Sequence, residues 1–359
     1  MNAAIELRIL DFLQKPDERE FESIALAIYA YQREQNPAYS RYCKFLGQSE
    51  PVVSWKGIPA VPQQAFKRAE LRSFPASETV IEFRTSGTTG EGFGRHFMRS
   101  VRLYEASVQG GWDYFRLPRH PLLLLMPHPA VARYSSLSRM GSILTNDRND
   151  AFFLDGNGAL QVDRLRKIVS ESGGPFTLFG PALAFVNLLE VIAELPLPPG
   201  SILMETGGFK GTNREIGKAD LYSRLSECFH LDFDSIWNEY GMTELSSQFY
   251  SNGLGSAHLA PPWLRFMIVD PKTNSEAATG EVGLLRIFDL ANLWSVLAIQ
   301  TQDLAVAQDG AGFLLLGRDP EALPRGCSRP IDELIRRYIS TKRETSGSIA
   351  NSNAVGGPC

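Results

Sequence analysis

The chain has 359 residues and a formal net charge of −4, from 36 Lys and Arg against 40 Asp and Glu. Hydrophobic residues make up 43% and charged residues 21%, which is ordinary for a globular protein whose core needs no disulfide or structural metal. The near-neutral charge argues against non-specific nucleic-acid binding, and apolar runs such as 122–126 are too short to span a membrane.

The cysteines and the first residues bear on the compartment. Cys43, Cys228, Cys327 and Cys359 form no CxxC pair and no Cys/His group at zinc spacing, which indicates free thiols in a reducing environment. Residues 1–8 lack a basic segment followed by an apolar stretch, so no secretory signal is predicted. We therefore expect a cytoplasmic protein in which at least one thiol is available for chemistry.

Helices are predicted first along the chain. Within residues 1–50, apolar side chains such as Phe21, Ile24 and Ile28 recur at helical spacing. From about residue 80, short apolar runs alternate with amphipathic helical stretches, a pattern typical of a largely parallel sheet covered by helices. The buried strands that we expect here are 122–126, 176–179 and 201–204.

Strands and turns dominate the second half of the pattern. From about His258 they replace the helices and predict a smaller β subregion. We place residues 1–318 in one large domain, with 319–344 as a short C-terminal remnant. Residues 345–359 are rich in Gly, Ser and Asn and carry no charged side chain, which predicts a disordered tail.

The sharpest local signal is the sequence TSGTTG at 85–90, which follows an apolar stretch. Gly87 and Gly90 allow a tight turn close to a ligand, and their amides can cradle an anion. The hydroxyls of the segment add donors for phosphate oxygens, whereas the Gly-Lys-Ser/Thr ending of a Walker A loop is missing. The segment predicts a phosphate-binding loop, with a polar hairpin turn as the alternative.

Two later segments also carry ligand-binding chemistry. NEYGMTEL at 238–245 offers an aromatic ring to stack on a base, a hydroxyl for a phosphate and a carboxylate for Mg²⁺. TQDL at 301–304 places Asp303 at the end of a strand, where an acid can bind both hydroxyls of a ribose. The plainer alternative for 238–245 is a loop leading into a helix capped by Thr243. The plainer alternative for Asp303 is an aspartate in a turn.

Taken in order, six motifs resemble the adenylate-forming enzymes, a superfamily that includes acyl-CoA synthetases, peptide-synthetase adenylation domains and beetle luciferases. These motifs are TSGTTG (85–90), TGGFKG (206–211), YGMTE (240–244), TGEVG (279–283), TQDL (301–304) and GR (317–318). Longer strings are similar to the acyl-protein synthetase branch, the LuxE type. They are YGMTELSSQFY (240–250), IPAVPQQAFK (58–67), RGCS (325–328) and the segment from Tyr31 to Tyr39.

This resemblance, which runs from about residue 20 to about residue 335, implies a fold and a reaction. The fold is the α/β large domain of adenylate-forming enzymes, with helix-flanked β-sheets, a smaller β subregion and a truncated C-terminal domain. The reaction uses ATP and Mg²⁺ to convert a fatty or related carboxylic acid into an acyl-adenylate, then passes the acyl group to a thiol. An acyl reductase or an acyl-carrier protein is the partner that the resemblance suggests.

The resemblance also implies roles for matching residues. Those for ATP phosphates are Thr85, Ser86, Gly87, Thr88, Thr89, Gly90 and Thr243, the last at the α-phosphate. Those for adenine and ribose are Gly207, Gly208, Phe209, Tyr240, Gly241, Asp303 and Arg318. Glu244 would ligate Mg²⁺.

The chain departs from the superfamily pattern in two places. Gln302 stands where a glycine is usual, which crowds the turn without removing the acid beside it. Only about forty residues follow Arg318, whereas most members carry a full C-terminal domain with a catalytic lysine. Lys342 lies in no recognisable motif, so Lys210 is the candidate cation for the α-phosphate or the acyl carboxylate, with a solvated loop lysine as its alternative.

Cys327 is the candidate acyl acceptor. Arg325 and a flexible glycine beside it favour a low thiol pKa and an exposed side chain, and LuxE-type enzymes carry the acyl group on a cysteine in this context. The alternatives are a structural cysteine and transfer to Cys359 at the chain end. Cys43 and Cys228 lie in helical patterns and are predicted to be small buried hydrophobic residues.

Two histidines are weaker candidates for the site. His128 follows an apolar strand, where the superfamily often has a residue beside the acyl pocket, and His96 follows the phosphate loop. A structural histidine is the alternative for each. Two other functions also stay open: a ligase that passes the acyl group to coenzyme A or a carrier protein, and a non-catalytic nucleotide- or acyl-binding homologue.

Overall fold

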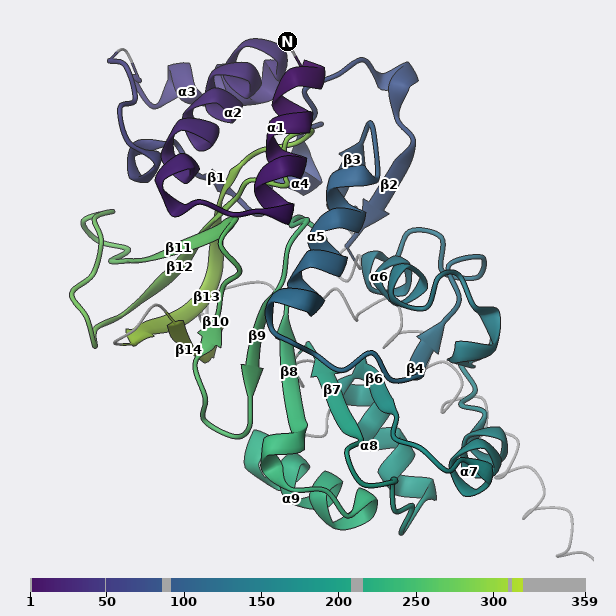
Figure 1. Ribbon diagram of the computed structural model, residues 1–359. Coiled ribbons are helices and arrows are strands. Elements are labelled where there is room, and N and C mark those ends of the chain that lie inside the picture. The colour runs from purple at the N-terminus through teal and green to yellow at the C-terminus, as the bar shows by residue number, and fades with distance from the viewer. Residues whose placement is uncertain (1, 49, 86–91, 208–215, 309–311, 319–359) are drawn as a thin grey trace, which may run out of the picture.

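The computed structural model describes residues 2–48, 50–85, 92–207, 216–308 and 312–318. The N-terminal layer is helical as predicted (Figure 1) and consists of α1 (Asn2–Gln14), α2 (Phe21–Gln35) and α3 (Pro37–Phe45). Asn36 separates α2 from α3 because its extended backbone ends one helix and its side chain accepts the Tyr39 N–H at 3.1 Å to begin the next. Pro37 occupies the first position of α3, where a missing N–H costs nothing.

Parallel strands form one half of a large sheet, in the order β5, β4, β6, β7, β8. They are β4 (Leu122–Pro127), β5 (Phe152–Leu154), β6 (Thr177–Pro181), β7 (Ile202–Thr206) and β8 (Ile236–Tyr240). The helices between and around them are α5 (Arg102–Tyr114), α6 (Ser136–Leu144), α7 (Val162–Glu171), α8 (Ala182–Val191) and α9 (Lys218–Phe229). The predicted alternation of buried strands and helices is therefore confirmed.

Antiparallel strands continue the same sheet beyond β8, in the order β9, β10, β14, β13, β12, β11. They are β9 (Phe249–Asn252), β10 (His258–Leu259), β11 (Leu264–Val269), β12 (Val282–Asp289), β13 (Ala298–Gln308) and β14 (Gly312–Arg318). The β subregion predicted from His258 is thus continuous with the parallel strands.

Four further short elements belong to the described fold. β1 (Val61–Pro62) joins the sheet in parallel with β13, and α4 (Ala65–Arg68) follows it. β2 (Ile81–Arg84) and β3 (Arg95–Met98) form a separate antiparallel hairpin. The N-terminal segment therefore reaches the strand that carries Asp303.

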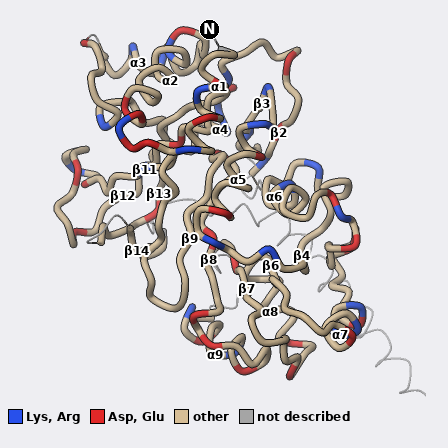
Figure 2. The backbone as a smooth tube through the Cα atoms, in the orientation of Figure 1, with Lys and Arg blue, Asp and Glu red and all other residues tan. Residues whose placement is uncertain are grey.

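Two apolar cores lie along the sheet. One surrounds the parallel strands and the helices α5 to α9, and the other joins α1 to α3 to the antiparallel strands. Charged residues of both signs are interspersed over the helices and loops around the strands (Figure 2). Cys43 and Cys228 are buried free thiols, which confirms their predicted place in the core. The predicted remnant 319–344 and tail 345–359 lie outside the described residues.

Candidate active site

Two of the ligand-binding motifs meet between β8 and β13. Tyr240, the last residue of β8, donates its hydroxyl to Asp303 Oδ2 at 2.6 Å, and both side chains are buried. The Asp303 backbone N–H donates to Thr301 Oγ1 at 3.1 Å. The ring of Tyr240 lies edge-on to Phe313 at 5.9 Å between centroids. The structure therefore brings together the aromatic ring and the acid that the sequence assigns to adenine and ribose.

The segment after Tyr240 turns without forming a helix. Residues 241–248 contain turns and bends, so the alternative of a helix capped by Thr243 is wrong. The Thr243 carbonyl accepts a hydrogen bond from His96 Nδ1 at 2.8 Å. Burial lowers the pKa of His96 to about 4, so a neutral ring with its proton on Nδ1 fits this contact. His96 thus lies next to the predicted phosphate-binding residue and supports its backbone.

Glu244 is held by a residue far away in the sequence. Its side chain is 3% exposed, and its Oε1 accepts a hydrogen bond from Gln63 Nε2 at 2.8 Å. The Glu244 carbonyl accepts a second bond from Asn292 Nδ2, also at 2.8 Å. Gln63 itself is fixed because its backbone N–H donates to the Gln300 carbonyl at 3.0 Å on β13. The carboxylate therefore has a defined orientation.

The oxygen atoms of Glu244 and its neighbour Gln63 are suitable ligands for Mg²⁺. Gln63 is 6% exposed, and its Oε1 has no hydrogen-bond partner among the described residues. Carboxylate and amide oxygens are hard ligands of the kind that Mg²⁺ takes in combination with substrate phosphates. No group of three His, Cys, Asp or Glu in the described ranges could hold a metal ion. A metal here would consequently depend on phosphate oxygens as well as on the protein.

The turn is anchored at its far end by an arrangement that we call the Asp289 cluster. Asp289 Oδ2 accepts the backbone N–H of Ser246 at 2.8 Å and that of Ser247 at 2.9 Å. Its Oδ1 accepts the Ser247 hydroxyl at 2.7 Å and the Ala291 N–H at 2.9 Å. The pKa of Asp289 is raised to about 6 because the carboxyl is buried. The four donors offset part of this rise by stabilising the anion. Each carboxylate oxygen thus has two donors.

A second buried carboxylate lies at the near end of the turn. Glu239 on β8 accepts the hydroxyl of Thr206 on β7, and burial raises the pKa of Glu239 to about 7. A Cβ added at Gly241 would lie 2.4 Å from Glu239 Oε1, which is closer than real side chains approach. Glycine is therefore required at this position while Glu239 keeps its place.

Four buried polar side chains form a line across β7, β8, β9 and β10, which we call the Glu205 row: Glu205, Asn238, Ser251 and His258. Asn238 Nδ2 donates to Glu205 Oε1 at 2.7 Å, and His258 Nε2 donates to Asn238 Oδ1 at 2.5 Å. Glu205 Oε2 and Ser251 Oγ have no hydrogen-bond partner among the described residues. The row is therefore less completely paired than the Asp289 cluster.

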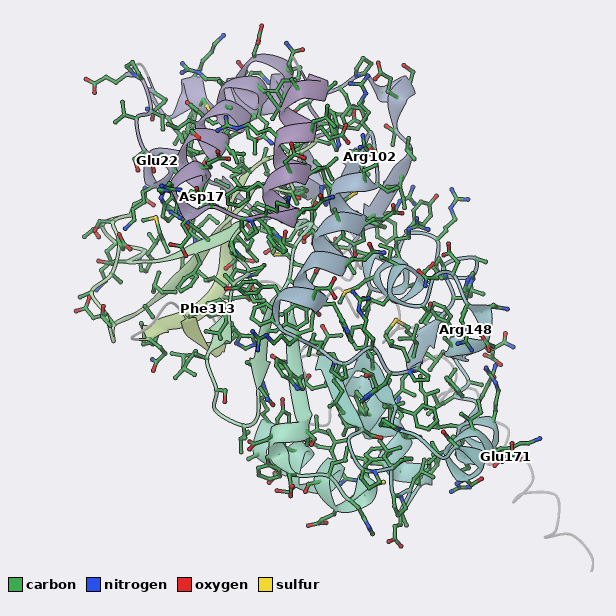
Figure 3. The ribbon with its side chains drawn as sticks, in the orientation of Figure 1. Asp17, Glu22, Arg102, Arg148, Glu171 and Phe313 are labelled. Atoms are coloured by element: carbon green, nitrogen blue, oxygen red, sulfur yellow. The ribbon has the colours of Figure 1, made fainter. Side chains whose placement is uncertain are left out.

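Electrostatics at the ends of the Glu205 row follow from burial. Burial raises the pKa of Glu205, while the Lys218 Nζ at 3.6 Å from its Oε1 lowers it in part. Burial, followed by the charge of Lys218, lowers the pKa of His258 to about 3. The His258 ring stacks on Phe313 at 5.3 Å between ring centroids. Figure 3 labels Phe313. His258 is accordingly a neutral ring at physiological pH.

Two ligases are similar in sequence to the chain, whereas no family model matches it. The chain is 23% identical over 381 residues to the long-chain-fatty-acid–luciferin-component ligase of Aliivibrio fischeri, covering 98% of this chain and 95% of that protein. It is 22% identical over 329 residues to the ligase of the same name from Vibrio harveyi, covering 86% of this chain and 87% of that one.

Solved structures decide the fold. A 2-hydroxyisobutyryl-CoA ligase in an open conformation with 2-HIB-AMP and CoA matches with a TM-score of 0.63 at 14% identity, covering 86% of this chain and 80% of that one. The chain has the fold of the adenylate-forming enzymes. ATP-bound MatB from Rhodopseudomonas palustris matches at TM-score 0.50 and 17% identity over 68% of this chain, which spans about half of MatB (49%). With the two ligases above, these matches confirm the predicted LuxE-type resemblance.

On this adenylate-forming fold, the predicted phosphate loop joins β2 to β3. Thr85 N donates to the Gly94 carbonyl at 2.9 Å, and Gly94 N donates to Thr85 Oγ1 at 2.8 Å, so the two residues close the base of the loop. The Arg84 guanidinium lies over the Tyr134 ring at 3.6 Å from its centroid. Residues 86–91 lie outside the described residues, so the phosphate role and its alternative, a polar hairpin turn, both stay predictions.

The remaining candidates are distributed as follows. Arg318 pairs with Asp303 in the register of β13 and β14, and Gly207 follows β7 with φ of +78°, a conformation that favours glycine. His128 accepts the Ala130 N–H at 3.2 Å and packs edge-on against Phe152. Candidates outside the described residues are Ser86, Gly87, Thr88, Thr89, Gly90, Gly208, Phe209, Lys210 and Cys327.

Sequence reasoning missed the supporting side chains of this site. Gln63 lies within the LuxE-type string 58–67, which marked the segment but not the residue. Asp289 is the last residue of β12 and Asn292 follows that strand, in a segment that no motif covers. Glu239 lies inside the segment 238–245, and its charge just before Tyr240 and Gly241 was the available signal. No described helix combines the length and apolar character that crossing a membrane requires.

Proposed function

We propose that the chain is an ATP-dependent ligase that activates a fatty or related carboxylic acid as an acyl-adenylate and then transfers the acyl group to a cysteine thiol. The single observation that carries the first half is the meeting of Tyr240 with Asp303, beside the turn that bears Thr243 and Glu244. The names of the two similar ligases support a long-chain fatty acid as the substrate class.

In the first step, a carboxylate oxygen attacks the α-phosphorus of ATP, and the bond from that phosphorus to the bridging oxygen breaks, releasing pyrophosphate. Tyr240 would stack on adenine and Asp303 would accept the ribose hydroxyls, which fixes the α-phosphate near Thr243. Mg²⁺ held at Glu244 would neutralise phosphate charge. The residues 85–90 would donate hydrogen bonds to the β- and γ-phosphates.

In the second step, the thiolate of Cys327 attacks the carbonyl carbon of the acyl-adenylate. A thioester bond forms, the bond to the phosphate oxygen breaks, and AMP leaves with the electron pair. The thiol proton passes to solvent because the thiolate is the attacking species. Lys210 is the proposed cation for the α-phosphate, and His128 the proposed neighbour of the acyl pocket.

Acid-dependent exchange of radiolabelled pyrophosphate into ATP tests the first step across a series of carboxylic acids. We expect exchange with long-chain fatty acids and its loss, by about 100-fold or more, in Glu244→Gln and Asp303→Asn. ATP binding without exchange for any acid would leave a nucleotide-binding protein and end the ligase proposal.

Labelled acid and ATP test the second step. We expect label on the denatured protein that hydroxylamine releases, its loss in Cys327→Ala, and its retention in the matched control Cys359→Ala. A free acyl-CoA product formed with coenzyme A, without label on the protein, would assign the chain to the CoA ligases. Loss in Cys359→Ala alone would move the acceptor to that residue.

A further inference from the structure

Gln63 is not among the site residues predicted from the sequence. It comes from the N-terminal segment 58–67, yet it is 6% exposed and contacts the carboxylate of Glu244. Its Nε2 donates to Glu244 Oε1 at 2.8 Å, whereas its Oε1 has no hydrogen-bond partner among the described residues. A buried amide oxygen without a partner is costly, because burial removes the water that would otherwise bind it.

The orientation of this amide follows from the chemistry of its partner. An ionised carboxylate can only accept, so the amide nitrogen has to face Glu244 and the amide oxygen has to face away from that bond. Both amide atoms lie on one planar group, so the free oxygen is within a few ångströms of the carboxylate. Two oxygens from different parts of the chain are therefore available together, one anionic and one neutral.

We propose that Gln63 is a positioning residue for the metal site: it holds the Glu244 carboxylate through Nε2 and offers Oε1 to Mg²⁺ or to one of its bound waters. The proposal rests on the proposed function, since it concerns the same metal. An amide oxygen is an accepted ligand for hard cations, and partners that orient a ligating carboxylate commonly change metal affinity when they are removed.

Contacts on both sides of segment 61–66 hold the backbone of Gln63 in place. Val61 and Pro62 pair in parallel with Ile299 and Gln300 on β13, three residues before Asp303. On the other side, Phe66 of α4 packs edge-on against His96 at 6.0 Å between centroids. His96 in turn donates to the Thr243 carbonyl. The segment 61–66 thus contacts β13 on one side and His96 on the other, and these contacts fix the backbone of Gln63.

The test compares Gln63→Met with Gln64→Met, a matched control. Gln64 is the adjacent residue of the same type, is less buried and makes no side-chain capping bond to α4. Mn²⁺ binding is measured by electron paramagnetic resonance on protein saturated with a non-hydrolysable ATP analogue. We expect Gln63→Met to weaken Mn²⁺ binding about tenfold and Gln64→Met to leave it unchanged. AMP binding without metal should stay within twofold in both variants.

Gln63→Glu separates a metal role from simple packing. It removes the Nε2 donor to Glu244 but keeps the shape and a metal-ligating oxygen, so Mn²⁺ bridging the two carboxylates should restore the affinity that Gln63→Met loses. Equal Mn²⁺ affinity in Gln63→Met and wild type would overturn the proposal, as would Gln63→Glu binding as weakly as Gln63→Met. If wild type itself binds no Mn²⁺ with the nucleotide analogue, the metal-dependent proposed function fails instead, which keeps the two failures distinct.

Discussion

Buried carboxylates anchor both ends of segment 239–247, but they accept different numbers of hydrogen bonds. At the far end, Asp289 has four donors, two on each oxygen. At the near end, Glu239 accepts the hydroxyl of Thr206, and in the neighbouring Glu205 row the Oε2 of Glu205 has no partner among the described residues. Burial is nearly complete in all three cases, so the number of donors is what differs.

This difference decides the charge at each end. The pKa of Asp289 is about 6, so it is mainly an anion at pH 7, whereas the pKa of Glu239 is about 7 and its carboxyl is half protonated there. A fully paired anion is a fixed anchor, because every donor would be left unpaired if it moved. A carboxyl with few donors can change its charge at little structural cost. The far end is therefore the rigid one.

Replacing the rigid anchor should have the largest effect. Asp289→Ala leaves four donors without an acceptor, two of them on the backbone of the turn, and should lower the free energy of unfolding by about 4 kcal/mol. Urea denaturation at pH 7 measures this. Asp270→Ala is the control, because Asp270 also accepts a backbone N–H but in an exposed turn. Equal losses in the two variants would mean that the Asp289 cluster is no anchor.

Glu239, the buried carboxyl at the near end, should make the stability of the protein depend on pH. Burial raises the pKa of Glu239 from 4.5 to about 7, so the folded protein retains a proton that the unfolded chain releases. This contribution is fully present below pH 4.5 and is lost as the pH rises through 7. Glu239→Gln cannot titrate, and its amide oxygen can still accept from Thr206.

We therefore compare each protein with its own stability at pH 5. By pH 8, Glu239→Gln should have lost about 2.5 kcal/mol less than wild type. Urea denaturation of both proteins at the two pH values gives this comparison. Parallel pH profiles would show that Glu239 titrates in the folded protein as it does in the unfolded chain, and the proposed contrast with Asp289 would be lost.

His258 in the Glu205 row should act with the opposite sign. Burial lowers the pKa of His258 from 6.5 to about 3, so on acidification the unfolded chain binds a proton before the folded protein does. This lowers the stability of wild type by about 2 kcal/mol between pH 7 and pH 5. His258→Gln keeps an N–H for Asn238 and should lack this loss. The control His230→Gln, at the surface, should still lose this stability on acidification. If His258→Gln also loses it, another group causes the acid sensitivity.

The sequence predicted the local parts of this architecture well. The apolar run 122–126 became β4, the run 201–204 became most of β7, and helical spacing located α2. These succeed because a buried strand or an amphipathic helix is determined by its own residues. The motifs likewise located Tyr240 and Asp303 in the chain. Asp303 lies inside β13, however, because the strand continues past the acid along its pairing with β14, so both the predicted place at a strand end and the alternative of a turn aspartate are wrong.

The long-range partners could not be predicted in this way. Gln63 meets Glu244 across 181 residues, and Gln32 accepts from Leu297 N across 265. Nothing in the periodicity around Gln63 or Asp289 distinguishes a buried polar side chain with a distant partner from a solvated one. The continuity of the antiparallel strands with the parallel ones was missed for the same reason, because sheet order depends on pairings between distant segments.

The smallest predicted effect concerns the contact between the two ligand-binding motifs. Tyr240→Phe removes the hydroxyl that donates to Asp303 and should cost about 1 kcal/mol of unfolding free energy. It should change ATP affinity by less than threefold, because the ring that stacks on adenine remains and the ribose hydroxyls can donate to Asp303 instead. Tyr240→Ala, which also removes the ring, should weaken ATP binding about tenfold. Calorimetric titration with ATP separates the two variants; equal weakening in both would mean that the Tyr240 hydroxyl, and not the ring, binds the nucleotide.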